Sequence, residues 1–348
     1  MITKTAEELE NLVREIFLAA GTDERNAGEV AQHLVLANLS GVDSHGIWHV
    51  GGYLKAMDAG EILPAAKPAM IKDMSAGALI TGNWTFGQVT ANYGMQVAID
   101  KAASGGISVV GLVQTHHIGR LGHFVETAAQ AGMIAMVWTG GYSEEEPATM
   151  PYGGSTRVLH TNPVAIGFPS GEEPSMMFDF ATTTASGVKV VNAFRRNESV
   201  PSGWIVDRNG NPTTNPADFF DGGGHIPFGG HKGYALMMAS EYFGRIFTGS
   251  EKYVESGRAG AINRQQGVTM VVMKSDLFRP LEDFTRQADE MEQRVRAVPP
   301  ASGFDEVLSP GDLEARTRVV RRRDGIPVED DVWQSLVDVA TSVNVRAE

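Results

Sequence analysis

Four consecutive residues, Asp43-Ser44-His45-Gly46, combine an acid, a hydroxyl, an imidazole and a glycine, and a second imidazole follows at His49. A helix that begins here would place His45 and His49 on one side of its first turn. An imidazole can give or take a proton near neutral pH, and Gly46 would let the backbone approach a ligand closely. The competing interpretation is a helix cap made by the acid or the hydroxyl, beside a histidine that only packs.

Other polar stretches lie where strands are predicted to end or helices to begin. They are Thr115-His116-His117-Ile118-Gly119, Leu159-His160-Thr161-Asn162-Pro163, Asp179-Phe180-Ala181-Thr182 and Gly229-Gly230-His231-Lys232-Gly233. The last suits a phosphate, because N–H groups at a helix start and a lysine ammonium both favour an anion. A metal site at His116, His117 and His123 is the alternative for the first, and a simple helix cap is the alternative for the third. The residue before a proline is normally extended, so Asn162 is expected to be held that way.

Composition narrows the classes of protein. The 348 residues favour two subdomains, and the net charge of −13 argues against a nucleic-acid partner. The absence of cysteine excludes disulfides, cysteine-ligated metal and a catalytic thiol. The N-terminus lacks the apolar core of a signal peptide and no apolar run is long enough for a membrane span, so we expect a cytoplasmic protein. The basic run over residues 318–323 is interpreted as a solvated helix face.

Hydrophobic periodicity predicts helices at both ends of the chain and an α/β region between them. The helices expected first cover residues 5–20 and 47–59, with another between them that starts at residue 23. A terminal helix over residues 330–343 is expected to return and pack on them. Strands are predicted at residues 107–113, 133–139, 164–168, 176–180, 189–191 and 268–274. The first two flank a helix over residues 119–131 in a βαβ-like unit, and a long helix is expected over residues 229–247.

The standard nucleotide-binding loops are missing. No G-x-G-x-x-G lies between a strand and a helix, and no G-x-x-x-x-G-K-S/T is present. A nucleotide, if bound, would be held by another kind of loop.

Taken together, these stretches resemble the malate/L-lactate dehydrogenase family of NAD(P)-dependent oxidoreductases. The matching elements, in chain order, are Asp43-Ser44-His45-Gly46, Gly87-Gln88, His117-x-Gly119, Pro151-Tyr152-Gly153-Gly154, Thr161-Asn162-Pro163, Asp179-Phe180-Ala181-Thr182, Pro212-Thr213-Thr214, Lys232-Gly233 and Pro310-Gly311. The resemblance implies a non-Rossmann, mixed-sheet cofactor domain over residues 71–304. It also implies a helical domain over residues 1–70 that is completed by residues 305–348, and a homodimer.

The resemblance also implies roles for residues of this chain. His45 would be the proton donor in reduction and the base in oxidation, oriented by Ser44. The expected cofactor-binding residues are His117, Ile118, Gly119, Arg120, Leu121, Asp179, Phe180, Ala181, Lys189, His231, Lys232, Gly233, Pro310 and Gly311. The expected substrate-binding residues are His49, Thr161, His117 and Arg120. No metal is implied, and the substrate would be a small 2-oxo acid or 2-hydroxy acid.

Two departures from the family pattern shape this expectation. Many members have an arginine where this chain has His49, so the substrate carboxylate would be held by Arg120 or by a charged His49. The imine reductases of the family have an aspartate in the segment where this chain reads Gly187-Val188-Lys189, which favours an oxo acid over a cyclic imine.

The cofactor and the kind of activity have alternatives. NAD and NADP both fit, and two arginines, Arg195 and Arg196, after the predicted strand at residues 189–191 favour NADP. Reduction of a cyclic imine is the alternative within the family. A metal-dependent hydrolase and a non-catalytic dinucleotide sensor are the alternatives outside it.

Overall fold

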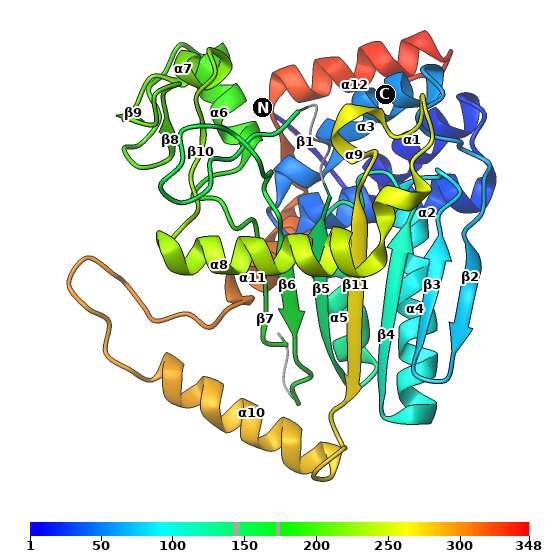
Figure 1. The fold of residues 1–348 in the computed structure, drawn as a ribbon, viewed down its shortest axis with the longest axis vertical. Helices are drawn as coiled ribbons and strands as arrows, with labels where there is room; N and C mark the ends of the chain where they lie inside the picture. The colour runs from blue at the N-terminus through cyan, green and yellow to red at the C-terminus, as the bar shows by residue number, and fades with distance from the viewer. Residues whose placement is uncertain (142–145, 172–174, 348) are drawn as a thin grey trace.

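A seven-stranded mixed sheet lies at the centre of the computed structural model, which describes residues 1–141, 146–171 and 175–347. Helices α4 (Gly87–Gly105) and α5 (Gly122–Gln130) cover one face, and α8 (His231–Glu241) crosses the other (Figure 1). The N-terminal helices and the C-terminal helix gather at one end of the sheet (Figure 1). A mixed α/β fold is therefore confirmed, while the division at residues 70/71 and 304/305 stays a prediction. No helix in the described part of the chain is long and apolar enough to span a bilayer.

The strand order of the sheet is β2-β3-β4-β11-β5-β6-β7. The strands are β2 (Ala69–Met74), β3 (Gly77–Thr81), β4 (Ile107–Val113), β5 (Met133–Gly140), β6 (Val164–Gly167), β7 (Met177–Phe180) and β11 (Gly267–Lys274). Only the β3–β4 pair is parallel. The elements of the predicted βαβ-like unit are present as β4, α5 and β5, and β11 lies between the two strands and is antiparallel to both. The apolar run of β11 is buried in this central place, although it comes from far along the chain.

The helical part joins both ends of the chain. It contains α1 (Ala6–Ala19), α2 (Glu24–Leu39), α3 (Val50–Asp58), α11 (Asp312–Asp324) and α12 (Asp330–Ser342). The predicted capping box opens α1, where Thr5 accepts from the Glu8 N–H and Glu8 accepts from the Thr5 N–H. Strand β1 (Ile2–Lys4) pairs with β12 (Ile326–Val328), which brings the predicted terminal helix back onto the N-terminal helices.

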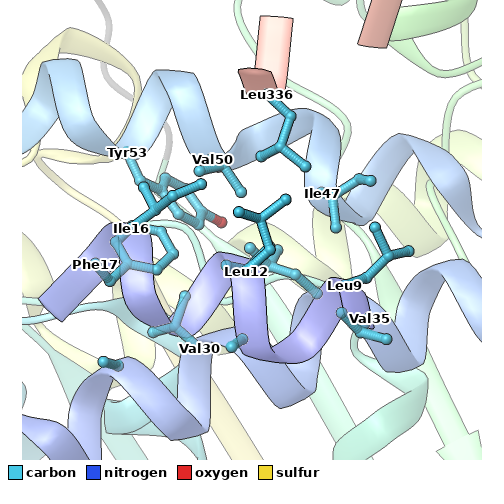
Figure 2. Close-up of a cluster of buried hydrophobic side chains, with 14 of the residues drawn as sticks. Leu9, Leu12, Ile16, Phe17, Val30, Val35, Ile47, Val50, Tyr53 and Leu336 are labelled. Carbon is cyan, nitrogen blue, oxygen red and sulfur yellow. The ribbon is translucent and has the colours of Figure 1, made fainter. Parts of the chain in front are cut away.

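One apolar core holds these helices together. Figure 2 shows Leu336 of α12 reaching toward Ile47 and Val50, with side chains of α1 and α2 below them. Phe17 of α1 meets Phe86 edge-on, with ring centroids 5.3 Å apart, and Phe86 directly precedes α4 of the sheet layer. The helical part is therefore packed directly onto the α/β part, and loss of the Phe17 ring would cost about 3–5 kcal/mol.

A small lobe and a few single elements complete the chain. The lobe contains α6 (Gly187–Arg195), β8 (Ile205–Val206), β9 (Pro212–Thr213), α7 (Pro216–Phe220) and β10 (Gly224–His225). The other elements are the π-helical turn η3 (Tyr242–Ile246), the 3-10 turn η4 (Ser250–Tyr253), α9 (Gly260–Asn263) and α10 (Leu281–Arg296).

Two predicted elements are wrong in part. Residues 189–191 form helix rather than strand, since Val190 and Ala193 pack at helical spacing against Val200 and Ile205. A short apolar run fits either periodicity, and only its packing partners decide. The long helix expected over residues 229–247 is α8 followed by a π-helical turn, where Gly244 comes so close to Gly140 that a Cβ would lie 2.0 Å from its nitrogen.

Candidate active site

A cavity of about 790 Å³ lies between the helical part and the end of the sheet. Its described lining residues fall within residues 42–61, 116–121, 160–163, 179–188 and 259–266, and at 139, 146 and 314. It therefore joins α3 to the loops that follow β4, β5 and β7, and to the segment that precedes β11. The sequence motifs around His45, His117, Thr161 and Asp179 all reach this one cavity, although they are far apart in the chain.

The backbone around His45 forms two 3-10 turns, η1 (Asp43–His45) and η2 (Ile47–His49), before α3 begins at Val50. The prediction that a helix runs from residue 47 is therefore wrong at its start. Gly46 approaches Asn38 rather than a ligand, since a Cβ there would lie 2.1 Å from the Asn38 side-chain oxygen. That oxygen accepts from the Ile47 N–H at 2.8 Å, so a side chain in α2 fixes the turn that carries His45.

Asp43 holds the same turn from the other side. It accepts from the Asn38 amide at 2.7 Å and from both terminal nitrogens of Arg321 at 2.7 and 3.1 Å. Among the described residues, neither Asp43 nor Ser44 makes a helix-cap hydrogen bond. The basic run at residues 318–323 is consequently not a purely solvated face, because Arg318 also pairs with Glu126.

Three imidazoles converge inside the cavity. The ring centroids of His45 and His117 are 5.6 Å apart, and those of His49 and His117 are 4.7 Å apart. His45 Nδ1 lies 3.1 Å from the Ser44 hydroxyl, and His49 Nε2 lies 2.9 Å from the Ser44 carbonyl oxygen. His49 therefore donates through Nε2 and is held by the backbone, while one face of its ring stacks on Tyr53 at 5.5 Å. The spacing of 45 and 49 brings both rings to one site without an α-helix between them.

A buried hydrogen-bond chain sets the proton position of His117. The Gln88 amide donates to the Tyr53 hydroxyl at 2.7 Å, and the Tyr53 oxygen lies 2.8 Å from His117 Nδ1. Burial raises the pKa of Tyr53, so the phenol keeps its proton and donates it to Nδ1. His117 Nδ1 is then an acceptor, and the proton of the neutral ring is on Nε2. The sequence analysis did not select Tyr53 for the site, although its place four residues after His49 was a usable signal.

Burial keeps the histidines of the cavity neutral. Burial, together with the positive charge of Arg120, lowers the pKa of His45 to about 4. It lowers the pKa of His49 to about 3 and that of His116 to about 4, and it lowers the pKa of His117 as well. Burial therefore disfavours the charged form of His49, one of the two expected carboxylate clamps, in the free protein.

Arg120, the other expected clamp, has its guanidinium already engaged. Its side chain is 2% exposed and donates to both oxygens of Glu126, at 3.0 and 3.3 Å. Glu126 also receives Arg318 from α11. The main-chain N–H of Arg120 donates to His33 Nε2 at 3.0 Å, which fixes the loop after β4. Arg120 thus forms part of the cavity wall and makes the local potential more positive, but both of its terminal guanidinium nitrogens already donate to Glu126.

Asp179, in β7, and Thr161, in the loop before β6, both line the cavity. Asp179, in β7, accepts from the Gly122 N–H at 2.7 Å, and burial raises its pKa to about 6. Thr161 accepts at its carbonyl from the Thr182 N–H at 2.9 Å. Asn162 is not extended as predicted but has a φ of +40°, since its buried side chain donates to Glu241 at 2.8 Å and accepts from the His160 N–H at 3.1 Å. Two side-chain hydrogen bonds here outweigh the usual preference before proline.

The expected cofactor residues fall into two groups. His117 to Leu121 and Asp179 to Ala181 line the cavity, whereas His231, Lys232, Gly233, Pro310 and Gly311 do not. The Pro310 carbonyl accepts from Met177 at the start of β7, and the His231 ring lies 6.1 Å from that of Tyr152. Lys189 is exposed on α6, with its ammonium 5.8 Å from the Trp204 ring, and lines a neighbouring pocket of about 540 Å³ that shares Ser44 and Phe180 with the cavity.

Buried polar atoms show whether the cavity suits a polar ligand such as a dinucleotide. His116 Nδ1, Thr139 Oγ1 and Gln266 Oε1 belong to residues that line it, and none has a hydrogen-bond partner among the described residues. Buried polar groups are normally paired, so these atoms fit a site that is completed by a polar ligand. The sequence analysis missed Thr139 and Gln266, since a lone threonine in a strand carries no local signal. In the described part of the chain, no group of three acidic or histidine side chains is arranged to hold a metal ion.

A family model described as malate/L-lactate dehydrogenase matches residues 5–337. The chain belongs to this family. It is 34% identical, over 98% of both chains, to a malate/(S)-sulfolactate dehydrogenase of Methanothermus fervidus. It is 32% identical to the ureidoglycolate dehydrogenase (NAD(+)) of Escherichia coli strain K12, over 96% of this chain and 95% of the relative. The crystal structure of malate dehydrogenase from Entamoeba histolytica superposes with a TM-score of 0.91 at 26% identity, covering 99% of this chain and 98% of the other.

Membership of the malate/L-lactate dehydrogenase family confirms the resemblance drawn from the motifs. It places the chain in an oxidoreductase family whose named relatives act on 2-hydroxy acids. It also accounts for the missing Rossmann loop, because the superposed fold is built on this mixed sheet rather than on a doubly wound parallel one.

Proposed function

We propose that the protein transfers a hydride between a nicotinamide dinucleotide and a small 2-oxo acid/2-hydroxy acid pair, with His45 moving the proton. The observation that carries this proposal is the convergence of His45, His49 and His117 in one cavity of a dehydrogenase-family chain. A bound nicotinamide supplies or accepts the hydride, and this chain's residues provide placement and the proton.

The buried, neutral state of His45 suits the oxidation direction. With a pKa of about 4, its ring accepts the hydroxyl proton of a 2-hydroxy acid at neutral pH, and Ser44 orients the ring through Nδ1. In reduction the same ring must first take up a proton and then give it to the carbonyl oxygen. A negatively charged substrate beside the ring favours this uptake, since an opposite charge stabilises the imidazolium.

We propose that neutral hydrogen-bond donors bind the substrate carboxylate in place of the arginine that many family members have at the position of His49. His117, whose Nε2 carries the proton, and Thr161, whose side chain borders the cavity, are the candidates for the substrate carboxylate. His49 acts mainly by packing, since its Nε2 is occupied by the Ser44 carbonyl. Arg120 acts through its positive potential, since its donors are directed to Glu126.

For the cofactor we propose His117 to Leu121 and Asp179 to Ala181 as the residues beside the nicotinamide half. The remaining expected residues, Lys189, His231 to Gly233 and Pro310-Gly311, would then contact more distant parts of the dinucleotide. The structure does not favour NADP, because Arg195 ends helix α6 instead of following a strand, and Arg196, the residue after the helix, pairs with Glu329. The ureidoglycolate dehydrogenase relative is named as an NAD(+) enzyme, and we propose NAD for this protein.

The test follows the absorbance of NADH and of NADPH, in parallel, with the purified protein and a panel of 2-oxo acids. We expect turnover with at least one acid. His45→Gln should reduce kcat by about 10²–10⁴ while leaving dinucleotide affinity nearly unchanged. Lost cofactor binding in a folded variant would make His45 a cofactor residue instead. Turnover of a cyclic imine alone, or binding without any turnover, would replace the proposal by the imine-reductase or the sensor function.

The expected homodimer is a separate proposal that rests on the family. Light scattering coupled to gel filtration tests it, and a mass near 37.4 kDa at micromolar concentration would contradict it.

A further inference from the structure

A buried carboxylate that the proposed mechanism does not use lies at the end of α8, the helix that crosses the sheet (Figure 1). Glu241 is the last residue of α8, directly before the π-helical turn η3, and is 9% exposed. Its carboxylate accepts from three groups: the Gly141 N–H at 2.9 Å, the Asn162 side-chain amide at 2.8 Å and Arg245 Nε at 2.6 Å. Glu241 is not among the described residues that line the cavity. Any effect on a bound substrate must therefore pass through its partners.

The Asn162 side chain connects Glu241 to the cavity wall. Its amide nitrogen donates to Glu241, because a carboxylate can only accept, and its amide oxygen accepts from the His160 N–H at 3.1 Å. Asn162 has a φ of +40°, which is uncommon for a residue other than glycine. His160, Thr161 and Pro163 line the cavity, whereas Asn162 between them is fully buried. The place of the Thr161 side chain therefore depends on a left-handed turn that Glu241 holds.

The same carboxylate fixes the end of the neighbouring strand β5. The Gly141 N–H, just after β5, donates to it, and a Cβ on Gly140 would lie 2.7 Å from the Glu241 Cα. Thr139, one residue earlier, lines the cavity, and its N–H donates to the Pro163 carbonyl at 3.2 Å. Glu241 thus joins two segments, the end of β5 and the loop before β6, where both form the cavity wall.

From these contacts we infer that Glu241 is a positioning residue of the active site. Its carboxylate holds Asn162 and thereby keeps the Thr161 hydroxyl where it binds the substrate carboxylate. This inference rests on the proposed function, which gives Thr161 to the substrate, and adds a residue that never touches the substrate. Each oxygen of Glu241 accepts at least one hydrogen bond, so a glutamine here would turn its NH2 group toward a donor in either orientation.

The first experiment measures kcat and KM of Glu241→Gln with NADH and either oxaloacetate or pyruvate, whichever the wild type reduces faster. We expect the KM for the acid to rise about tenfold, since a hydrogen bond to a charged substrate is weakened. The kcat should stay within about threefold, because this contact is made equally before and during hydride transfer. The affinity for NADH, from fluorescence titration, should stay within about twofold. A role in stability alone would lower kcat with the folded fraction and leave KM unchanged, and that result would overturn the inference.

Glu29→Gln is the matched control. Glu29 also accepts from an arginine four residues away, Arg25, and from an asparagine amide, that of Asn92. It is not among the described residues that line the cavity, and none of its partners is either. The KM of this variant should stay within about twofold of the wild-type value. A rise equal to that of Glu241→Gln would show a general effect of losing a paired carboxylate and would overturn the inference.

A double-mutant cycle tests whether Glu241 acts through Thr161. Thr161→Val removes the hydroxyl and should raise KM by itself, so that adding Glu241→Gln should raise it less than twofold further. Effects that multiply fully in the double variant would mean that Glu241 acts elsewhere, against the inference.

Asn162→Gly is the second variant, which keeps the test decisive if Glu241→Gln does not fold. Glycine adopts a positive φ without strain, so this change removes the side-chain hydrogen bonds and leaves the turn accessible. It should raise KM about tenfold, and an unchanged KM would overturn the inference. A failure of the proposed function looks different, because the wild type itself would then reduce neither acid.

Discussion

Removal of the Tyr53 hydroxyl would test the hydrogen-bond chain that orients His117. Tyr53 takes a hydrogen bond from Gln88 and gives one to His117, and neither Tyr53 nor Gln88 is accessible to solvent beyond 3%. In Tyr53→Phe the Gln88 amide would lose its only partner, because its carbonyl oxygen already has none in the described part of the chain. An orphaned buried donor costs about 1–3 kcal/mol, and the acceptor His117 Nδ1 loses its partner as well. We therefore expect the free energy of unfolding to fall by about 2–4 kcal/mol.

Urea denaturation measures this loss as a lower midpoint at an unchanged slope. Tyr93→Phe is the matched control, since Tyr93 is half-buried on α4 and makes no side-chain hydrogen bond within the described residues. Its loss should be within about 0.5 kcal/mol. Gln88→Met in the Tyr53→Phe background should recover part of the stability, because it removes the orphaned amide. The reasoning is refuted if Tyr53→Phe costs no more than Tyr93→Phe. Nitrogen NMR of His117 gives a second readout, with the proton on Nε2 in the wild type and a mixture of the two neutral tautomers in the variant.

Further predictions concern pH and buried charge. With the His45 pKa at about 4, kcat/KM for oxidation of the 2-hydroxy acid should be flat around neutral pH. The kcat/KM for reduction of the 2-oxo acid should fall about tenfold for each unit by which the pH rises. A flat profile for reduction would exclude His45 as the proton carrier. Burial lowers the pKa of the cavity histidines below 6.5, so the free energy of unfolding should be at its full value above pH 6.5 and should fall as the pH is lowered toward 4. The loss should be at most about 1.4 kcal/mol per pH unit for each histidine. Urea unfolding curves that coincide at pH 7 and pH 5 would contradict this prediction. Glu126→Gln should cost about 3–5 kcal/mol, because it leaves Arg120 and Arg318 without a carboxylate. Glu306→Gln is the control, because it breaks an exposed ion pair with Arg316 and should lower the free energy of unfolding by less than about 1 kcal/mol. Equal urea midpoints for the two variants would show that the buried ion pairs of Glu126 do not stabilise the fold.

Local patterns in the sequence were enough to predict the elements and the family. Helical spacing and the Thr5–Glu8 capping box placed α1, and long apolar runs placed β4, β5 and β11 within a residue or two. These features depend on neighbouring residues, so they can be read from a single stretch. The residues 189–191 show the limit, because two valines after a lysine fit strand and helix alike until their packing partners are known.

The sequence by itself therefore determined which side chains could do chemistry: a serine–histidine pair at residues 44 and 45, a second histidine at 117, and an acid at 179. The tertiary structure alone decided their chemical state. The proton on His117 depends on Tyr53, 64 positions away, and the engagement of Arg120 depends on an acid that also binds α11. The neutrality of His45 and His49 depends on burial, which belongs to the packed core and to no single segment. Periodicity is a local property of a chain, whereas hydrogen-bond partners and desolvation arise only when distant segments pack together.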